Sequence, residues 1–238
     1  DGKAWMSTGQ TDRIFTTTDE GLTWDELLIP TISNQGLGSV VVGRGDRLIV
    51  PQPTFSPNIW ISDDNGANWE SRPSPLGFGD SVKRGLYVGK GRILYLVNTG
   101  IASFGPKLLA SNDNGLTWQL EDPFQEIDEL ARVFNNPEQR VIQLQRLFRS
   151  EAGTLIILGE QGELLVSRDL GRSWEVKLFL ERLEDDSLDW RISDVMESDG
   201  RLIAIATRNS PNSSAFRVNY AYVSEDEGDS WFPGEIPT

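Results

Sequence analysis

The chain has 238 residues, 38% of them hydrophobic, and a net charge of −14, a composition that suits an all-β fold whose strands give alternate residues to solvent. The acidic charge argues against a nucleic-acid partner and against docking on anionic membranes, because both depend on clustered Lys and Arg. Without cysteine or histidine, the chain has no disulfide, thiolate, His-based metal site or Ser-His-Asp triad, and nothing in it predicts a metal or a cofactor.

In chain order, the sequence predicts five similar units of antiparallel strands. The first unit, residues 1–30, has three predicted strands, at Gly2–Ser7, Arg13–Thr17 and Thr23–Ile29. The other four units each predict four strands, with a tight Gly turn between the first two; they occupy residues 37–73, 80–122, 140–180 and 190–236. The first unit therefore lacks its innermost strand, and we expect nineteen strands in a single domain, residues 1–238.

One segment between the third and fourth units has helical spacing. Its apolar residues are Phe124, Ile127, Leu130, Ala131 and Phe134, which predict a short amphipathic helix over residues 125–135. We interpret this helix as a lid on a sheet edge; a partner-docking helix is the alternative.

An octapeptide recurs once in each unit, with the pattern [S/T]-x-D-x-G-x-[T/S/N]-W. The five copies are Thr17–Trp24, Ser62–Trp69, Ser111–Trp118, Ser167–Trp174 and Ser224–Trp231. Their aspartates are Asp19, Asp64, Asp113, Asp169 and Asp226, and their closing tryptophans are Trp24, Trp69, Trp118, Trp174 and Trp231.

Each position of the octapeptide has a local role. An Asp side chain can accept hydrogen bonds from backbone N–H groups of the turn that follows it. Gly permits the positive φ that a chain reversal needs, and Trp supplies a large apolar body that packs under the turn. The pattern therefore predicts a self-capped β-hairpin.

The octapeptide resembles the Asp box, or BNR repeat, of sialidases, of the VPS10 domains of sortilin-type receptors, of xyloglucanase-type glycosidases and of assembly factors related to Ycf48. The resemblance implies an all-β fold, a β-propeller of five four-stranded Asp-box blades, the first of which lacks its innermost strand. It also implies that the five aspartates are structural and lie away from the propeller axis.

The missing strand of the first blade leaves three interpretations open. The chain is cropped from a larger propeller, or a tail or partner strand completes the blade, or the ring closes with one three-stranded blade. The second interpretation predicts self-association through the first blade.

The resemblance to sialidases does not extend to their catalytic groups. Those enzymes carry an Arg-Ile-Pro motif, which this sequence lacks, and a Tyr–Glu nucleophile pair, whereas the four tyrosines here fall in strand patterns. The densest acidic stretch, Asp185, Asp186, Asp189 and Asp194, is interpreted as a solvated loop rather than as a carboxylate pair or a calcium loop. We assign no catalytic residue.

The expected contact surface consists of the long loops opposite the octapeptides. Aromatic side chains on loops rich in Gly, Ser and Pro suit stacking on sugars or contacts with proteins, although each ring could instead pack into its own blade. The candidate binding residues are Phe55, Phe78, Phe104, Trp190 and Phe216, together with Arg208 and Arg217.

These features favour a non-catalytic module that binds a protein or glycan ligand or acts in assembly, outside the cytoplasm (secreted, periplasmic, luminal or on the cell surface). The first alternative is a sialidase-like glycoside hydrolase or a fragment of one. The second is a structural subunit of a polymer, completed by a neighbour's strand. No run of 18 apolar residues occurs, so membrane insertion is not expected.

Overall fold

The computed structural model describes residues 2–8, 13–30, 36–52, 57–77, 79–98, 106–124, 127, 144–159, 163–179, 189–209 and 217–234. The chain divides into two compact units, Asp1–Asp122 and Pro123–Thr238, and each is described by itself. The helix predicted at residues 125–135 lies outside the described residues, apart from Ile127. No helix among the described residues is long and apolar enough to cross a membrane.

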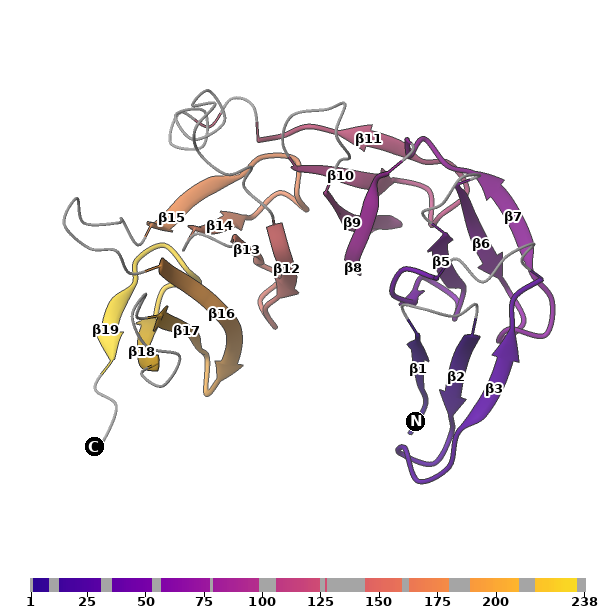
Figure 1. Cartoon of the computed structure of the whole chain (residues 1–238), viewed down its shortest axis with the longest axis horizontal. Helices are drawn as coiled ribbons and strands as arrows, with labels where there is room; N and C mark the ends of the chain where they lie inside the picture. The colour runs from indigo at the N-terminus through magenta and orange to yellow at the C-terminus, as the bar shows by residue number, and fades with distance from the viewer. Residues whose placement is uncertain are drawn as a thin grey trace. The chain divides into compact units, whose positions relative to one another are not determined.

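The first unit contains three antiparallel sheets, each a simple up-and-down meander (Figure 1). The first sheet has β1 (Ala4–Ser7), β2 (Arg13–Thr17) and β3 (Asp25–Leu28). The second has β4 (Val41–Val42), β5 (Leu48–Gln52), β6 (Asn58–Ser62) and β7 (Glu70–Pro73). The third has β8 (Ser81–Gly89), β9 (Arg92–Asn98), β10 (Pro106–Ser111) and β11 (Gln119–Glu121).

The second unit contains two further meanders of four strands. One has β12 (Leu144–Arg149), β13 (Leu155–Gly159), β14 (Glu163–Ser167) and β15 (Glu175–Phe179). The other has β16 (Asp189–Ser198), β17 (Arg201–Asn209), β18 (Arg217–Ser224) and β19 (Phe232–Gly234). Over the described residues the strands number nineteen, as predicted, and the first sheet has three strands where the others have four.

Burial is concentrated in the middle strands of the sheets. Every residue of β5, β13 and β14 is buried, whereas the outermost strands β3 and β7 are largely exposed. Strands that are buried on both faces read as near-continuous apolar runs, as in Leu155–Gly159. The sheets therefore pack face to face within each unit.

Three apolar clusters fill the space between neighbouring sheets. In the first unit, Ile14, Leu37 and Val50 form one cluster with Trp5 and Trp69 packed against it. A second cluster joins residues of β5 and β6 to residues of β9 and β10, with Trp118 packed on it. In the second unit a cluster joins β13 and β14 to β16 and β17. Face-to-face packing of this kind is how an antiparallel sheet with two apolar faces is covered.

In three of the four-stranded sheets that the described residues form, the first strand pairs irregularly with the second. The register shifts between Val82 and Gly85 in β8, between Leu144 and Arg146 in β12, and between Ile192 and Asp194 in β16. Such bulges bend a strand and turn side chains out of the regular alternation. In the remaining four-stranded sheet, the first strand is β4, which is only two residues long.

Candidate binding site

All five octapeptides form the same hydrogen-bonded turn, which Ser111–Trp118 illustrates. The Asp113 Oδ1 atom accepts the backbone N–H of Thr117 at 2.8 Å, and Oδ2 accepts its hydroxyl at 2.6 Å. The Ser111 hydroxyl donates to Asp113 Oδ1 at 2.8 Å and accepts the N–H of Gly115 at 2.8 Å. The carboxylates of Asp19, Asp64, Asp169 and Asp226 have the corresponding contacts.

Two residues of positive φ reverse the chain in every octapeptide. In the third sheet these are Asn114 at 60° and Gly115 at 89°. The glycine also has a packing role, because a Cβ on Gly66 would lie 2.5 Å from the Leu27 Cδ1 atom. A glycine is therefore required there both by the backbone conformation and by the close approach of the neighbouring sheet.

The indole of the closing tryptophan ties the turn to itself in four copies. Trp24, Trp118, Trp174 and Trp231 each donate Nε1–H to the carbonyl of the octapeptide glycine, at 2.8–3.2 Å. The Nε1 atom of Trp69 is buried and has no hydrogen-bond partner among the residues that the structure describes. The second copy is therefore the exception.

The carboxylates of these turns are held in their ionised form. Hydrogen bonds from the hydroxyl and N–H of Thr23 lower the pKa of Asp19 to about 2, and those from Ser230 lower the pKa of Asp226 to about 2. An acid that gives up its proton at such a pH cannot serve as a general acid near neutrality. Because each carboxylate is also occupied by its own turn, these groups suit a structural role.

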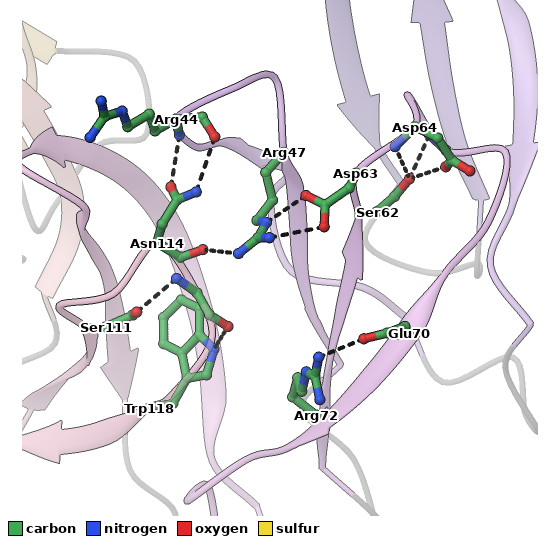
Figure 2. Close-up of polar contacts among 12 residues, drawn as sticks. Arg44, Arg47, Ser62, Asp63, Asp64, Glu70, Arg72, Ser111, Asn114 and Trp118 are labelled. Carbon is green, nitrogen blue, oxygen red and sulfur yellow. Dashed lines mark hydrogen bonds and ion pairs between the residues drawn. The ribbon is translucent and has the colours of Figure 1, made fainter.

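In the first unit, one turn reaches the neighbouring sheet (Figure 2). The Asn114 side chain accepts the N–H of Arg44 at 2.7 Å and donates to its carbonyl at 3.0 Å. Arg47 donates to the Asn114 carbonyl at 3.0 Å and holds Asp63 through two bonds of 2.6 and 2.9 Å. The β4–β5 turn of the second sheet is thus fixed to the octapeptide of the third.

The second unit repeats this connection with other residues. Glu227, which holds the position of Asn114 in its octapeptide, accepts the hydroxyl of Ser150 at 2.8 Å. Arg168 donates to the Glu227 carbonyl at 3.2 Å and pairs with Asp229 at 3.1 Å. These contacts join sheet to sheet, and none of them leaves a group free for a ligand.

A second region, at the first strands of the second and third sheets, has the features of a binding site. Residues 39–42 and 84–87 line a depression of about 280 Å³. The N–H of Gly85 donates to the Ser39 hydroxyl at 2.8 Å, and the ring of Tyr95 lies directly against Gly85, where no Cβ would fit. Tyr95 is itself anchored, since its hydroxyl donates to the Ile49 carbonyl at 3.0 Å.

The bulge in β8 contains two cations, of which Arg84 lines this depression. Lys83 and Arg84 lie between Val82 and Gly85, where the pairing with β9 shifts, and both side chains are exposed. Neither forms an ion pair with a described residue. In a chain of net charge −14, the Arg84 cation, which has no ion pair with any described residue and lines the depression together with half-buried Val40 and Leu86, is a candidate site for an anionic group on an apolar stem.

The structure gives little information on the binding residues predicted from the sequence. Phe55, Phe78, Phe104 and Phe216 lie outside the described residues. Arg217 begins strand β18, and Trp190 and Arg208 lie one residue from an end of β16 and β17, opposite each other in the register. The side chains of all three lie outside the described residues. All seven assignments stay predictions.

Sequence reasoning missed the depression at β8. A signal was present, because a glycine inside a predicted strand often marks a bulge or a close backbone approach, and Gly85 follows two consecutive cations. Among the described residues no group of three or more acidic side chains could hold a metal ion.

No protein-family profile and no curated protein matches the chain. Solved structures do resemble it. A structure of YCF48 bound to D1 peptide has a TM-score of 0.59 and 18% identity, over 98% of this chain and 64% of that one. An ancestral GH74 enzyme has a TM-score of 0.63 and 14% identity, over 98% of this chain and 29% of that one.

The NanB sialidase from Streptococcus pneumoniae also resembles the chain, with a TM-score of 0.52 and 17% identity over 84% of this chain and 33% of that one. Together with these neighbours, the five sheets define the fold of the chain as an all-β propeller. Solved proteins that share this fold include YCF48, an ancestral GH74 enzyme and the NanB sialidase, and the chain spans between 29% and 64% of their lengths. At these identities the likeness shows the fold alone.

Proposed function

We propose that the chain is a non-catalytic module that binds a protein partner through the β8 bulge and the depression beside it. The observation that carries the proposal is Arg84, which is exposed, forms no ion pair with a described residue and lines a depression of mixed polar and apolar character, with Lys83 next to it in the chain. A guanidinium in this setting favours a carboxylate, which it can bind through two parallel hydrogen bonds.

The size of the depression favours a protein over a glycan. Its volume of about 280 Å³ is at the lower limit of the roughly 300–1,000 Å³ that small-molecule sites occupy. Such a depression accommodates one or two side chains. We therefore infer that the ligand is an acidic peptide segment with an apolar side chain next to its carboxylate. We do not expect a nucleic-acid ligand, because the chain has a net charge of −14.

The comparisons support this proposal without deciding it. YCF48 has been solved with a D1 peptide bound, so one protein of this fold binds a peptide. The octapeptide resembles the Asp box, and on that resemblance we also propose a location outside the cytoplasm.

The test is a titration of the chain with a fluorescent acidic peptide, acetyl-Gly-Glu-Leu-Glu-Leu-Gly. Arg84→Glu is expected to weaken binding at least tenfold, because it replaces attraction by repulsion at the contact. Lys90→Glu is the matched control: it makes the same charge change at an exposed residue just beyond β8, and we expect less than a twofold effect. Equal loss in the two variants would mean that only net charge matters and would reject the site.

The alternative of a glycoside hydrolase, or a fragment of one, rests on the similarity of fold to the GH74 enzyme and the sialidase. Hydrolysis of a methylumbelliferyl sialoside or of xyloglucan by the purified chain would establish it in place of the proposal. The other alternative is self-association through the three-stranded first sheet. Light scattering at two concentrations measures that directly.

A further inference from the structure

One position next to the first-strand bulge is equivalent in the four-stranded sheets that the described residues form. In each of them the octapeptide serine lies opposite a residue of the second strand, and that strand in turn pairs with the first. In the third sheet, Gly85 lies opposite Tyr95, which is two residues past the partner of Ser111, and Arg84 directly precedes Gly85. Counted in this way from the second sheet to the fifth, the equivalent residues are Ser39, Arg84, Arg146 and Asp194.

In the second unit this position forms an ion pair between neighbouring sheets. Arg146 of β12 donates to Asp194 of β16, with the Nη1 and Oδ1 atoms 2.5 Å apart. Asp194 is followed in its strand by the buried Val195. The second unit therefore pairs a cation on one first strand with a carboxylate on the next, and the carboxylate has an aliphatic neighbour.

In the first unit the same position has two hydrogen-bond donors and no carboxylate. Ser39 and Arg84 both line the depression between β4 and β8, and the Ser39 hydroxyl accepts the N–H of Gly85, the residue after Arg84, at 2.8 Å. A serine hydroxyl that accepts a bond still has its own hydrogen to donate. Among the described residues neither this hydrogen nor the Arg84 guanidinium has an acceptor.

We propose that Ser39 is a specificity-determining residue of this depression: its hydroxyl and the Arg84 guanidinium together bind one carboxylate of the protein partner. That carboxylate has the role that Asp194 has beside Arg146 in the second unit. The inference rests on the proposed function and deepens it, because it adds a second donor and predicts that the site prefers a carboxylate to the corresponding amide. Hydrogen bonds to an ionised acceptor are roughly twice as strong as those to a neutral one.

The first test compares two fluorescent peptides in titrations of the whole chain: acetyl-Gly-Glu-Leu-Glu-Leu-Gly and the same peptide with Gln in place of both Glu residues. We expect the wild type to bind the Glu peptide at least tenfold more tightly. Ser39→Ala should reduce this preference at least threefold. If Ser39 acted only through its bond to Gly85, the variant would weaken both peptides equally, and an unchanged preference would overturn the proposal.

A second variant gives the first unit the ion pair of the second. In Ser39→Asp the new carboxylate should pair with Arg84, as Asp194 does with Arg146, and weaken binding of the Glu peptide at least tenfold. Ser71→Asp is the matched control, because it makes the same change at an exposed residue of the same sheet, and its effect should be less than twofold. Equal binding by the two variants would refute the proposal.

The same titrations separate failure of this inference from failure of the proposed function. If the wild type binds the Glu peptide and Arg84→Glu prevents binding, the proposed function stands, and the two Ser39 variants then decide whether the hydroxyl takes part. If the wild type does not bind the Glu peptide at 1 mM, the proposed function is wrong, and the role of Ser39 is rejected with it.

Discussion

The side chain of Asn114 holds both backbone groups of Arg44, a residue 70 positions away. The amide oxygen accepts the N–H and the amide nitrogen donates to the carbonyl (Figure 2). An extended strand would satisfy both groups of such a residue, so here one side chain takes the place of a neighbouring strand. Asparagine suits this position because its backbone also adopts the left-handed conformation, with φ of 60°.

Removal of this side chain should loosen the second sheet from the third. We expect Asn114→Ala to lower the stability of the first unit by about 1–3 kcal/mol, because two backbone groups lose their partner. Asn65→Ala is the matched control, since Asn65 holds the same octapeptide position, has φ of 57° and is exposed. Urea denaturation measures the free energy of unfolding of both variants. An equal loss of stability would show that the left-handed backbone conformation, and not the contact with Arg44, accounts for the effect.

The octapeptide glycine of the second sheet should tolerate no side chain. Gly66→Ala adds a methyl group at φ of 90° against the Leu27 Cδ1 atom; Gly45→Ala adds one at φ of 73° with no atom within 4 Å. Both variants carry the cost of about 1–2 kcal/mol that the left-handed backbone conformation imposes on a residue with a Cβ, whereas overpacking adds about 1–3 kcal/mol for Gly66 alone. In thermal unfolding, the midpoint temperature of Gly66→Ala should therefore be clearly lower than that of Gly45→Ala.

The two tryptophans of the second and third octapeptides should respond differently to the same change. Trp118→Phe breaks the bond of 2.8 Å to the Gly115 carbonyl and should cost about 1 kcal/mol beyond the lost packing. Trp69→Phe removes a buried donor that has no partner, so the same substitution should cost less there. Urea denaturation should give a larger drop in midpoint for Trp118→Phe than for Trp69→Phe. A larger drop for Trp69→Phe would contradict this prediction.

The sequence predicts the octapeptide turns well because their contacts are local. Asp113 binds Thr117 four residues on, so residue types and spacing suffice. The contact of Asn114 with Arg44 depends on how two sheets pack, which no local pattern encodes. The bulge that presents Arg84 depends on pairing with β9, and only Gly85 signals it in the sequence.

The pH dependence of stability follows from the lowered pKa of the octapeptide aspartates. Hydrogen bonds from Thr23 favour the ionised form of Asp19 in the folded state, where its pKa is about 2 against 3.8 as the ordinary value. The stabilisation is therefore complete above about pH 4, and it is lost as the pH falls from about 4 to about 2.

This linkage predicts how a variant at Asp19 behaves. Asp19→Asn should have a lower urea midpoint than the wild type between pH 6 and about pH 4, and the difference should shrink from there toward pH 2.5, where the wild-type carboxylate also begins to protonate. Asp25→Asn, at an exposed position in the same sheet, controls for the loss of one negative charge. A difference between wild type and Asp19→Asn that stays constant over this range would mean that the turn does not depend on the ionised carboxylate.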